Sequence, residues 1–267
     1  MTDAEVPVLA AATVVLLRHG AAPLEVFMLK RNAESGFVPG AYLFPGGAVD
    51  AADSSADLVE RSALSRARAA DLLGRTDGIA FWMGAIRETF EEAGLLMAER
   101  RNTADGGLGL SDPATASRFA EHRRVVDLGE RPFGEVCLEE DLMLRTDLLH
   151  PFARWITPLG APRRYDTRFF VAAPPADQEA SHDGIEAVDS LWISPADALA
   201  RERSGEWPMI EPTTRTLEVL ARFGDADSAL DAISSASRDG RPDDVREHGA
   251  IRVRLPFDDA TSSPVGT

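Results

Sequence analysis

The chain has 267 residues, and its 44% hydrophobic content is enough to build the core of one large domain. Its formal net charge of −16 at pH 7 argues against a general nucleic-acid binder or a protein of anionic membrane surfaces, because such proteins usually present basic faces. The single cysteine, Cys137, excludes an intramolecular disulfide and a cysteine-based zinc cluster, so we expect it to pack in the core. The most apolar run near the start, residues 6–17, is too short to span a bilayer. We therefore expect a cytoplasmic protein with a small-molecule ligand.

The first part of the chain is expected to form strands. Residues 13–20 and 25–32 are typical of two strands joined by a short turn at 20–23, which predicts an antiparallel hairpin. The segment 36–50 is too rich in glycine and proline for a helix, so we expect one strand between tight loops. Residues 54–78 are polar with helical leucine spacing and are predicted to form an inserted helical excursion.

The rest of the chain is expected to alternate between helices and strands. In chain order we expect a polar stretch at 100–113 and two helices at 114–128 and 135–148. Two strands at 167–174 and 187–194 and two further helices at 195–205 and 212–223 are expected to follow. Residues 224–267 are rich in Asp, Ser, Gly and Pro, which predicts a loosely attached, extended tail with one edge segment.

Three carboxylates crowd one predicted helix in the stretch AIRETFEEAG, residues 85–94. Glu88, Glu91 and Glu92 have a spacing at which like charges destabilise a helix by roughly 0.2–0.5 kcal/mol per pair. All three project from one face, while the far side carries an apolar stripe of Trp82, Ile86 and Phe90. A solvated charged face would also fit this pattern. A hard divalent cation is the functional interpretation, because it prefers oxygen ligands and turns the repulsion into attraction.

The motif around these acids resembles the signature of the Nudix hydrolases. The glycine pair Gly46–Gly47 lies ahead of the segment R-E-x-x-E-E-x-G-L at 87–95, which has Thr89 where the family usually has an aliphatic residue. In the first half of the signature, Asp53 stands where the family has glutamate, and the long segment 54–86 separates it from the second half. We interpret this as a signature that an insertion splits into two parts, since long loops cost little closure entropy.

The resemblance implies an α/β fold, namely a Nudix α/β/α sandwich with a mixed sheet and helical insertions. The Nudix domain would cover 10–223, with 54–78 inserted in the signature and 100–150 forming a helical insertion, followed by the tail at 224–267. We expect the second insertion to shape the substrate pocket or to contact a second copy in a homodimer.

The resemblance also implies the roles of the acidic side chains. Glu88, Glu91 and Glu92 would bind Mg²⁺ or Mn²⁺, with one of them or a later acid as the base, and Arg87 would orient a glutamate. Among later acids, Glu186 lies in a loop before a predicted strand and is the candidate extra ligand or base, with Asp183 as the alternative. The five histidines have no ligand spacing, so none is assigned a catalytic role.

A narrower resemblance concerns the substrate. The FPGG loop, the long interruption and the later RWITP and RYDTRFF segments are similar to the coenzyme-A-directed Nudix subgroup. Arg31 and Gly40 follow part of a coenzyme A motif, whose second arginine is replaced by Gly36. We therefore expect three residues to bind substrate, namely Arg31, Gly46 and Gly47. Arg164 and Arg168 are further phosphate candidates, whereas we expect the aromatic residues Trp155 and Phe169 to pack in the core.

The function that this resemblance implies is metal-dependent hydrolysis of a diphosphate linkage, X-O-P-O-P-Y. Coenzyme A or acyl-coenzyme A would be cut to 3′,5′-ADP and a phosphopantetheine. NADH and ADP-ribose are the alternative substrates. A non-catalytic Nudix domain for ligand binding or regulation is the alternative from a different functional class.

Overall fold

The computed structural model describes residues 6–34, 38–101, 107–239, 249–251 and 255. Its main sheet is mixed, with the order β10-β7-β8-β1-β2-β3, and with β4 paired to β1 and β9 paired to β2. The long β1–β8 pairing is parallel, and the other pairings of this sheet are antiparallel. The strands are β1 (Val8–Arg18), β2 (Glu25–Arg31), β3 (Tyr42–Leu43), β4 (Gly46–Ala48), β7 (His150–Ile156), β8 (Arg164–Ala172), β9 (Ala187–Ile193) and β10 (Ala250–Ile251).

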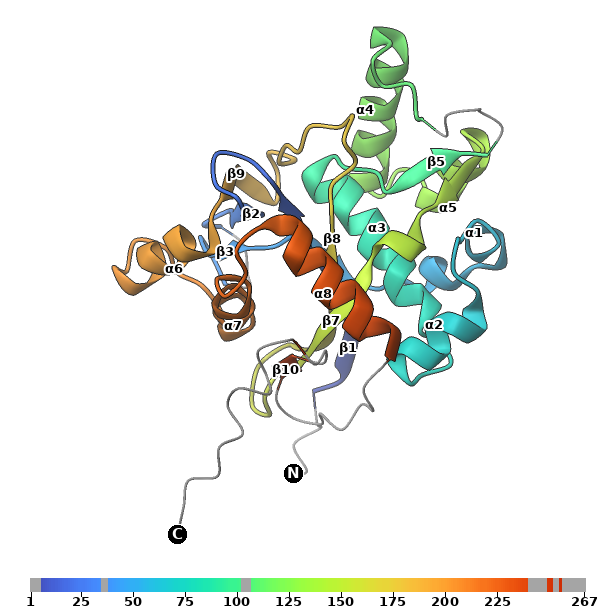
Figure 1. Cartoon of the computed structure of the whole chain (residues 1–267). Helices are drawn as coiled ribbons and strands as arrows, with labels where there is room; N and C mark the ends of the chain where they lie inside the picture. The colour runs from blue at the N-terminus through green and yellow to red at the C-terminus, as the bar shows by residue number, and fades with distance from the viewer. Residues whose placement is uncertain (1–5, 35–37, 102–106, 240–248, 252–254, 256–267) are drawn as a thin grey trace.

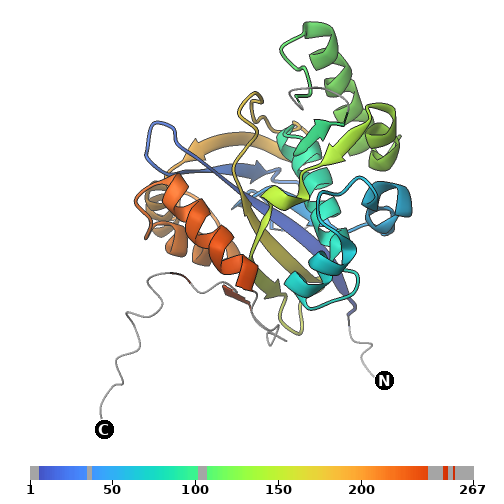
Figure 2. The same cartoon turned by 45° about the vertical axis from the view of Figure 1, so that its right-hand side comes forward.

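Helices cover both faces of this sheet (Figures 1 and 2). The helices before β7 are η1 (Ala51–Ser54), α1 (Ala56–Val59), α2 (Arg66–Leu73), α3 (Ile79–Ala93), α4 (Pro113–Asp127), α5 (Phe133–Glu139) and η2 (Thr146–Leu148). Those after β9 are α6 (Pro195–Arg203), α7 (Glu211–Leu220) and α8 (Ala226–Asp239). A small second sheet pairs β5 (Ala98–Arg100) with β6 (Leu142–Leu144).

Strand β1 separates two hydrophobic cores, because successive side chains of a strand point to opposite faces. Val14 and Leu16 belong to the core that contains α3, α4 and α5. Val15 and Leu17 belong to the other core, which contains α6, α7 and α8. All four side chains are fully buried. The predicted α/β/α sandwich with a mixed sheet is therefore confirmed.

The predicted hairpin at the start of the chain is confirmed, with Leu17 opposite Val26 at the end of β1. The next segment differs from the prediction, because it forms two short strands and not one. Leu43 pairs with Leu29 of β2, whereas Gly46 already pairs with Thr13 of β1. The chain thus crosses from one strand to its neighbour within a few residues. This crossing places the glycine pair beside β1, within the sheet.

Each insertion combines helices with contacts to the rest of the domain. In the first one, Arg75 donates to Asp166 of β8 at 3.3 Å. In the second, the helix expected over 135–148 ends at residue 139, and the chain then turns at Asp141, whose φ is 48°. The strand β6 that follows pairs with β5, so the polar stretch after α3 begins with a strand that the sequence analysis did not predict.

Residues 226–239, which we expected in an extended tail, form helix α8 and lie across the sheet (Figure 1). Ala226, Ala229 and Ile233 are at most 1% exposed and belong to the core shared with α6 and α7. The polar composition of the whole tail concealed this apolar stripe, whose spacing of three and four residues is helical. The expected edge segment is present as the short strand β10, which pairs with β7. No helix within the described residues has the length and apolar character needed to cross a bilayer.

If α8 is part of the core, shortening its buried side chain should destabilise the whole domain. We expect Ile233→Ala to lower the free energy of unfolding by about 2–5 kcal/mol, because it leaves a cavity between α8 and the sheet. Chemical denaturation measures this change, and Asp231→Ala on the exposed side of α8 is the matched control, expected within about 0.5 kcal/mol of the parent. Equal stabilities of the two variants would contradict the packing of α8.

Candidate active site

Helix α3 carries the acidic residues and is buried around most of its circumference. The predicted apolar stripe is confirmed, since Trp82, Ile86 and Phe90 are at most 3% exposed. Thr89 is also fully buried, and its Oγ1 donates to the carbonyl of Ala85 at 2.7 Å, which explains how a polar side chain is tolerated there. The helix ends at Gly94, whose φ of 69° lies in the left-handed region that favours glycine.

Arg87 is the residue that joins the parts of the site. Its Nε and Nη2 donate to the two carboxylate oxygens of Asp53, each at 3.0 Å, and Nη2 also donates to the carbonyl of Ala48 at 2.8 Å. Its Nη1 donates to Glu88 at 2.8 Å and to Glu91 at 3.0 Å. Burial opposes the positive charge, but the bonds to Asp53 and the nearby glutamates outweigh it and raise the pKa of Arg87. The guanidinium therefore stays charged and orients both glutamates.

Asp53 has a clear structural role that the sequence analysis left open. It is 1% exposed and lies in η1, where it also accepts the backbone N–H of Asp50 at 2.8 Å. A Cβ on Gly84 of α3 would lie 2.9 Å from Asp53 Oδ2, so a glycine leaves room for this carboxylate. Burial raises the pKa of Asp53, and the bonds from Arg87 oppose that effect. Its spacing from Gly47 was the sequence signal that could have identified it as a site residue.

The glycine pair of β4 lies directly over the acids of α3. The backbone N–H of Gly46 donates to Glu92 Oε2 at 2.7 Å. A Cβ at Gly46 would lie 2.3 Å from the carbonyl oxygen of Ala12, and its φ is 154°, so only glycine fits this approach. At Gly47 a Cβ would lie 2.4 Å from Glu88 Oε2, which shows how closely the backbone of Gly47 approaches the Glu88 carboxylate.

A cavity of about 580 Å³ lies beside these residues. It brings together most of the residues that the sequence analysis assigned to catalysis or substrate binding. Those that line it are Arg31, Gly46, Gly47, Glu88, Glu92 and Glu186. Glu91 is not among the lining residues; its carboxylate points to Arg87 instead.

Arg31 and Glu186 meet in this cavity because β2 and β9 are paired. The backbone N–H of Asn32 donates to the carbonyl of Glu186 at 2.8 Å, and Arg31 Nη2 lies 3.5 Å from Glu186 Oε2. Among the described residues, Arg31 Nε is buried and has no hydrogen-bond partner, so one donor of this guanidinium is unsatisfied. The two residues are 155 positions apart in the chain, so only the strand register reveals their contact.

Asp183, the alternative to Glu186, has a different position. Its Oδ1 accepts the backbone N–H groups of Ile185, Glu186 and Ala187, the second at 2.7 Å. It therefore shapes the turn that carries Glu186 and does not line the cavity. Gly36, the departure from the coenzyme A motif, lies outside the described residues.

The alternation of β8 explains which of its residues reach the cavity. Arg164 and Arg168, two phosphate candidates, lie on the far side of the strand and are at most 4% exposed. The odd-numbered neighbours Tyr165, Thr167 and Phe169 line the cavity together with Trp155 of β7. Phe169 and Trp155 are therefore wall residues of the cavity as well as packing residues. Arg163, just before β8, also lines it and was missed, although period-two alternation was the available signal.

The electrostatics of the three glutamates are those of a site that needs a cation. Burial raises the pKa of Glu88 to about 7 and that of Glu91 to about 8, with Arg87 opposing both shifts. Burial, together with the charge of Glu88, raises the pKa of Glu92 as well, although the Gly46 N–H opposes it. Two positive charges, those of Arg87 and Arg31, lie against the three glutamates, Asp53 and Glu186.

These residues suit a hard divalent ion by their donor chemistry. Glu88 and Glu92 offer carboxylate oxygens at the cavity wall, and Glu186 adds another from the loop between β8 and β9. Such oxygen-only sets are preferred by Mg²⁺ and Mn²⁺, and a bound cation would lower the pKa values that burial raises.

A second acidic cluster lies away from the cavity. His122, Glu139 and Glu140 are the one group of three such residues, among those described, whose ligand atoms all lie within 4.8 Å of one another. Glu140 is already bound by Arg100, Arg118 and His122, and Glu139 by Arg131. These arginines neutralise the cluster, so we assign it a structural role in the second insertion.

Comparison with known proteins places this arrangement in a family. The family model of the NUDT19 Nudix domain matches residues 63–218, which is more than half of the chain. The chain belongs to this family. Its Nudix fold is shared by the crystal structure of a NUDIX hydrolase from Alicyclobacillus acidocaldarius, which is 28% identical and covers 86% of this chain and 98% of that one with a TM-score of 0.68.

Two curated relatives carry the name acyl-coenzyme A diphosphatase NUDT19. The protein of Gallus gallus is 33% identical over 240 residues, which cover 76% of this chain and 63% of that protein. The protein of Homo sapiens is 31% identical over 230 residues, which cover 74% and 60%. This Nudix chain thus spans somewhat less than two thirds of the length of these relatives.

The contact between Asp53 and Arg87 should be required for both stability and activity. Asp53→Ala leaves the buried guanidinium without its two-point partner, and breaking such a pair costs about 3–5 kcal/mol. We expect a matching loss of unfolding free energy in denaturation, together with weaker binding of Mn²⁺ measured by calorimetry. The control is Asp57→Ala, which removes an exposed acid of helix α1 and should change neither the unfolding free energy nor the binding of Mn²⁺.

The raised pKa values of the glutamates predict how stability depends on pH without metal. Glu88 and Glu91 bind protons in the folded protein up to about pH 7 and 8, whereas in the unfolded chain they lose them near the ordinary glutamate pKa of 4.5. Between these pH values the folded state binds more protons than the unfolded chain. The contribution of these protons to the free energy of unfolding is therefore lost as the pH rises from about 5 to 8. We expect the Tm in EDTA to fall over this range and Mg²⁺ to raise it again at pH 8.

The double replacement of Glu88 and Glu91 by glutamine is the control for this measurement. It should flatten the dependence of Tm on pH, since the amides do not titrate in this range. A dependence as steep as that of the parent would assign the effect to other groups.

Proposed function

We propose that this Nudix protein is a metal-dependent hydrolase that cleaves the diphosphate of coenzyme A or acyl-coenzyme A, releasing 3′,5′-ADP and a phosphopantetheine. The observation that carries the proposal is the cavity lined by Glu88 and Glu92 of α3, the glycine pair, Arg31 and Glu186. The family membership and the names of the relatives from Gallus gallus and Homo sapiens support the same substrate class.

The residues of the site have separate tasks in this proposal. Glu88, Glu91 and Glu92 would hold Mg²⁺ or Mn²⁺, which when bound polarises the phosphoryl oxygens and favours ionisation of a water. Arg87, held by Asp53, keeps Glu88 and Glu91 in place. The Gly46 N–H fixes the direction in which Glu92 presents its second oxygen.

Glu186 is the proposed general base. It lines the same cavity as Glu88 and Glu92, its side chain is more than half exposed, and among the described residues its carboxylate is contacted by Arg31 at 3.5 Å. A base must accept a proton from a water beside the phosphorus, and a carboxylate in the same cavity as the metal-binding acids can do so. Attack of that water on one phosphorus breaks the P–O bond to the bridging oxygen, which leaves with the other phosphate.

Arg31 and the cavity wall account for the proposed substrate. Arg31 lines the cavity with a buried donor that has no partner among the described residues, and a guanidinium matches phosphate oxygens bidentately. The apolar part of the wall includes Phe44, Trp155, Ile156 and Phe169, which suits the uncharged arm of a coenzyme A thioester. NADH and ADP-ribose share the diphosphate but lack both this arm and the 3′-phosphate.

A comparison of hydrolysis rates tests the proposal. We expect coenzyme A and its thioesters to be cleaved with a kcat/KM at least about 10-fold above those of dephospho-coenzyme A, NADH and ADP-ribose in Mg²⁺ or Mn²⁺. Glu92→Gln should lower kcat at least about 100-fold for every substrate while the protein stays folded, because it removes a charged ligand. Product identification by mass spectrometry should give 3′,5′-ADP.

Three results would contradict parts of this proposal. Faster cleavage of ADP-ribose than of coenzyme A would overturn the substrate. Full activity of Glu92→Gln would overturn the metal-site assignment. Ligand-dependent thermal shifts without turnover of any diphosphate would favour a binding domain instead. Arg31→Ala serves as the matched variant, since a selective loss of coenzyme A cleavage is expected if Arg31 recognises this substrate.

A further inference from the structure

An arginine of the second insertion holds the end of the proposed catalytic helix. Arg123 lies on α4, and its Nε donates to the carbonyl of Glu91 at 2.9 Å while its Nη2 donates to the carbonyl of Glu92 at 3.0 Å. These carbonyls belong to the last turn of α3, where the helix itself provides no further donors. A cation at this end of a helix also faces the negative pole of the helix dipole.

The same guanidinium binds the loop between β8 and β9. Arg123 Nη2 donates to the carbonyl of Ser181 at 2.8 Å, and Nη1 donates to Ser181 Oγ at 3.2 Å. Ser181 in turn donates its N–H to the carbonyl of Ala93 at 2.9 Å, so the loop contacts α3 directly. Figures 1 and 2 show this loop beside the end of α3 and the base of α4.

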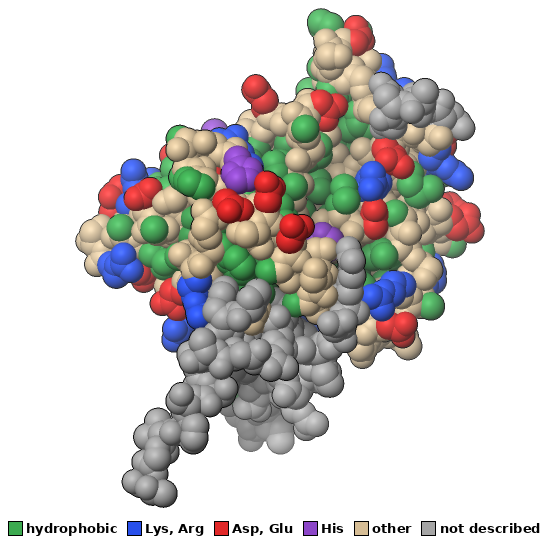
Figure 3. All heavy atoms as spheres, in the orientation of Figure 1, with side chains coloured by type: hydrophobic (Ala, Val, Ile, Leu, Met, Phe, Trp, Pro, Cys, Tyr) green, Lys and Arg blue, Asp and Glu red, His purple; other side chains and the backbone are tan. Residues whose placement is uncertain are grey.

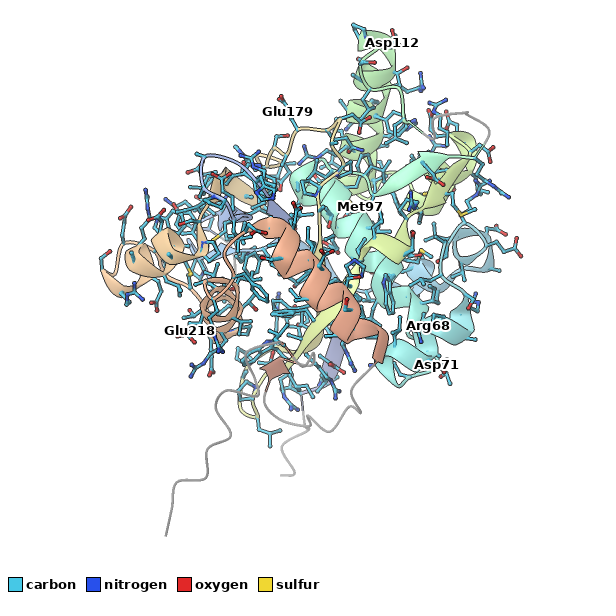
Figure 4. The ribbon with its side chains drawn as sticks, viewed as in Figure 1. Arg68, Asp71, Met97, Asp112, Glu179 and Glu218 are labelled. Carbon is cyan, nitrogen blue, oxygen red and sulfur yellow. The ribbon has the colours of Figure 1, made fainter. Side chains whose placement is uncertain are left out.

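Gln178 strengthens the same attachment from within the loop. Its side chain accepts the N–H of Leu96 at 2.8 Å and donates to the carbonyl of Leu96 at 3.0 Å. The next residue, Glu179, points away from the molecule, as its label in Figure 4 shows. Asp112 marks the far tip of α4 in the same view, so the contact made by Arg123 lies well along the helix from its free end.

The attached loop carries the proposed base. Two residues after Ser181, Asp183 folds the chain into the turn whose N–H groups it accepts, and this turn places Glu186 at the cavity. The side chain of Arg123 therefore binds both the backbone that presents Glu91 and Glu92 and the loop that presents Glu186.

We propose that Arg123 is a positioning residue that fixes the distance between the carboxylates of α3 and the carboxylate of Glu186. The inference rests on the proposed function for its catalytic consequence, but its structural half does not. It also assigns a task to the second insertion, which would then complete the site from outside the sandwich. A lysine could not replace Arg123, because one ammonium cannot reach three carbonyls and a hydroxyl in a fixed plane.

The neighbouring arginine provides a matched control. Arg124 lies next to Arg123 on α4, but it is about half exposed and pairs with Glu121 and Glu130 at the surface. Removing Arg124 deletes the same charge from the same helix without touching α3 or the loop. A difference between the two variants therefore reports on the contacts of Arg123 and not on the net charge.

Hydrogen exchange of the full chain tests the structural half. In Arg123→Ala we expect the amides of residues 178–187 to exchange at least about 10-fold faster, while those of β1 remain unchanged, because only the local attachment is lost. Arg124→Ala should exchange like the parent. If Arg123→Ala does not fold, Arg123→Gln carries the same comparison. Unchanged exchange in 178–187 would overturn the proposal.

A double-mutant cycle tests the catalytic half. We expect Arg123→Ala to lower kcat roughly 10- to 100-fold with little change in KM, since misplacing a reacting group by about 1 Å can cost this much. If the effect runs through Glu186, adding Arg123→Ala to Glu186→Gln should lower kcat little further. Arg123→Lys should remain as impaired as Arg123→Ala.

Two kinetic outcomes would overturn the proposal, namely losses that multiply in the double variant and full rescue by lysine. Failure of the proposed function looks different. In that case the parent hydrolyses none of the diphosphates, and the exchange experiment still decides whether Arg123 holds the loop to α3.

Discussion

The buried ion pair between Arg87 and Asp53 is the constraint on which the rest of the site depends. Both side chains lie inside the protein, where an unpaired charge would be very costly, so α3 and η1 must meet in one register. The guanidinium has donors left over, and these hold Glu88, Glu91 and the carbonyl of Ala48. One cation therefore organises the glycine strand, the acidic helix and the start of the first insertion at the same time.

This arrangement explains why three carboxylates can crowd one helix. The positive charge of Arg87 offsets the negative charges of Glu88 and Glu91, and the backbone N–H of Gly46 donates to one oxygen of Glu92. The remaining negative charge is directed to a cavity and away from the apolar cores, which α3 fills with its other faces. The face shown in Figure 3 is mixed in charge, with acidic and basic side chains interspersed.

The two insertions leave the sandwich intact because each is tied to it by buried or half-buried arginines. Arg75 of the first insertion reaches Asp166 on the sheet, and Arg123 of the second reaches the end of α3. Long insertions cost little in loop-closure entropy, so such anchors are sufficient to keep the interrupted motif assembled.

The sequence by itself determined the local features: the strands of the initial hairpin, the helix that carries the acidic residues, the three carboxylates on one face and the resemblance to the Nudix family. These follow from periodicity and spacing within a few turns of chain, where near neighbours dominate the energy. Only the tertiary structure decided that residues 226–239 are a core helix, that β6 replaces the end of a predicted helix, and that Asp53 belongs to the site. It also decided which side chains share the cavity, since Arg31 meets Glu186, and Arg123 meets α3, through strand register and helix packing between distant segments. Such contacts are fixed by the burial of apolar surface across the whole domain, which no local pattern of residues encodes.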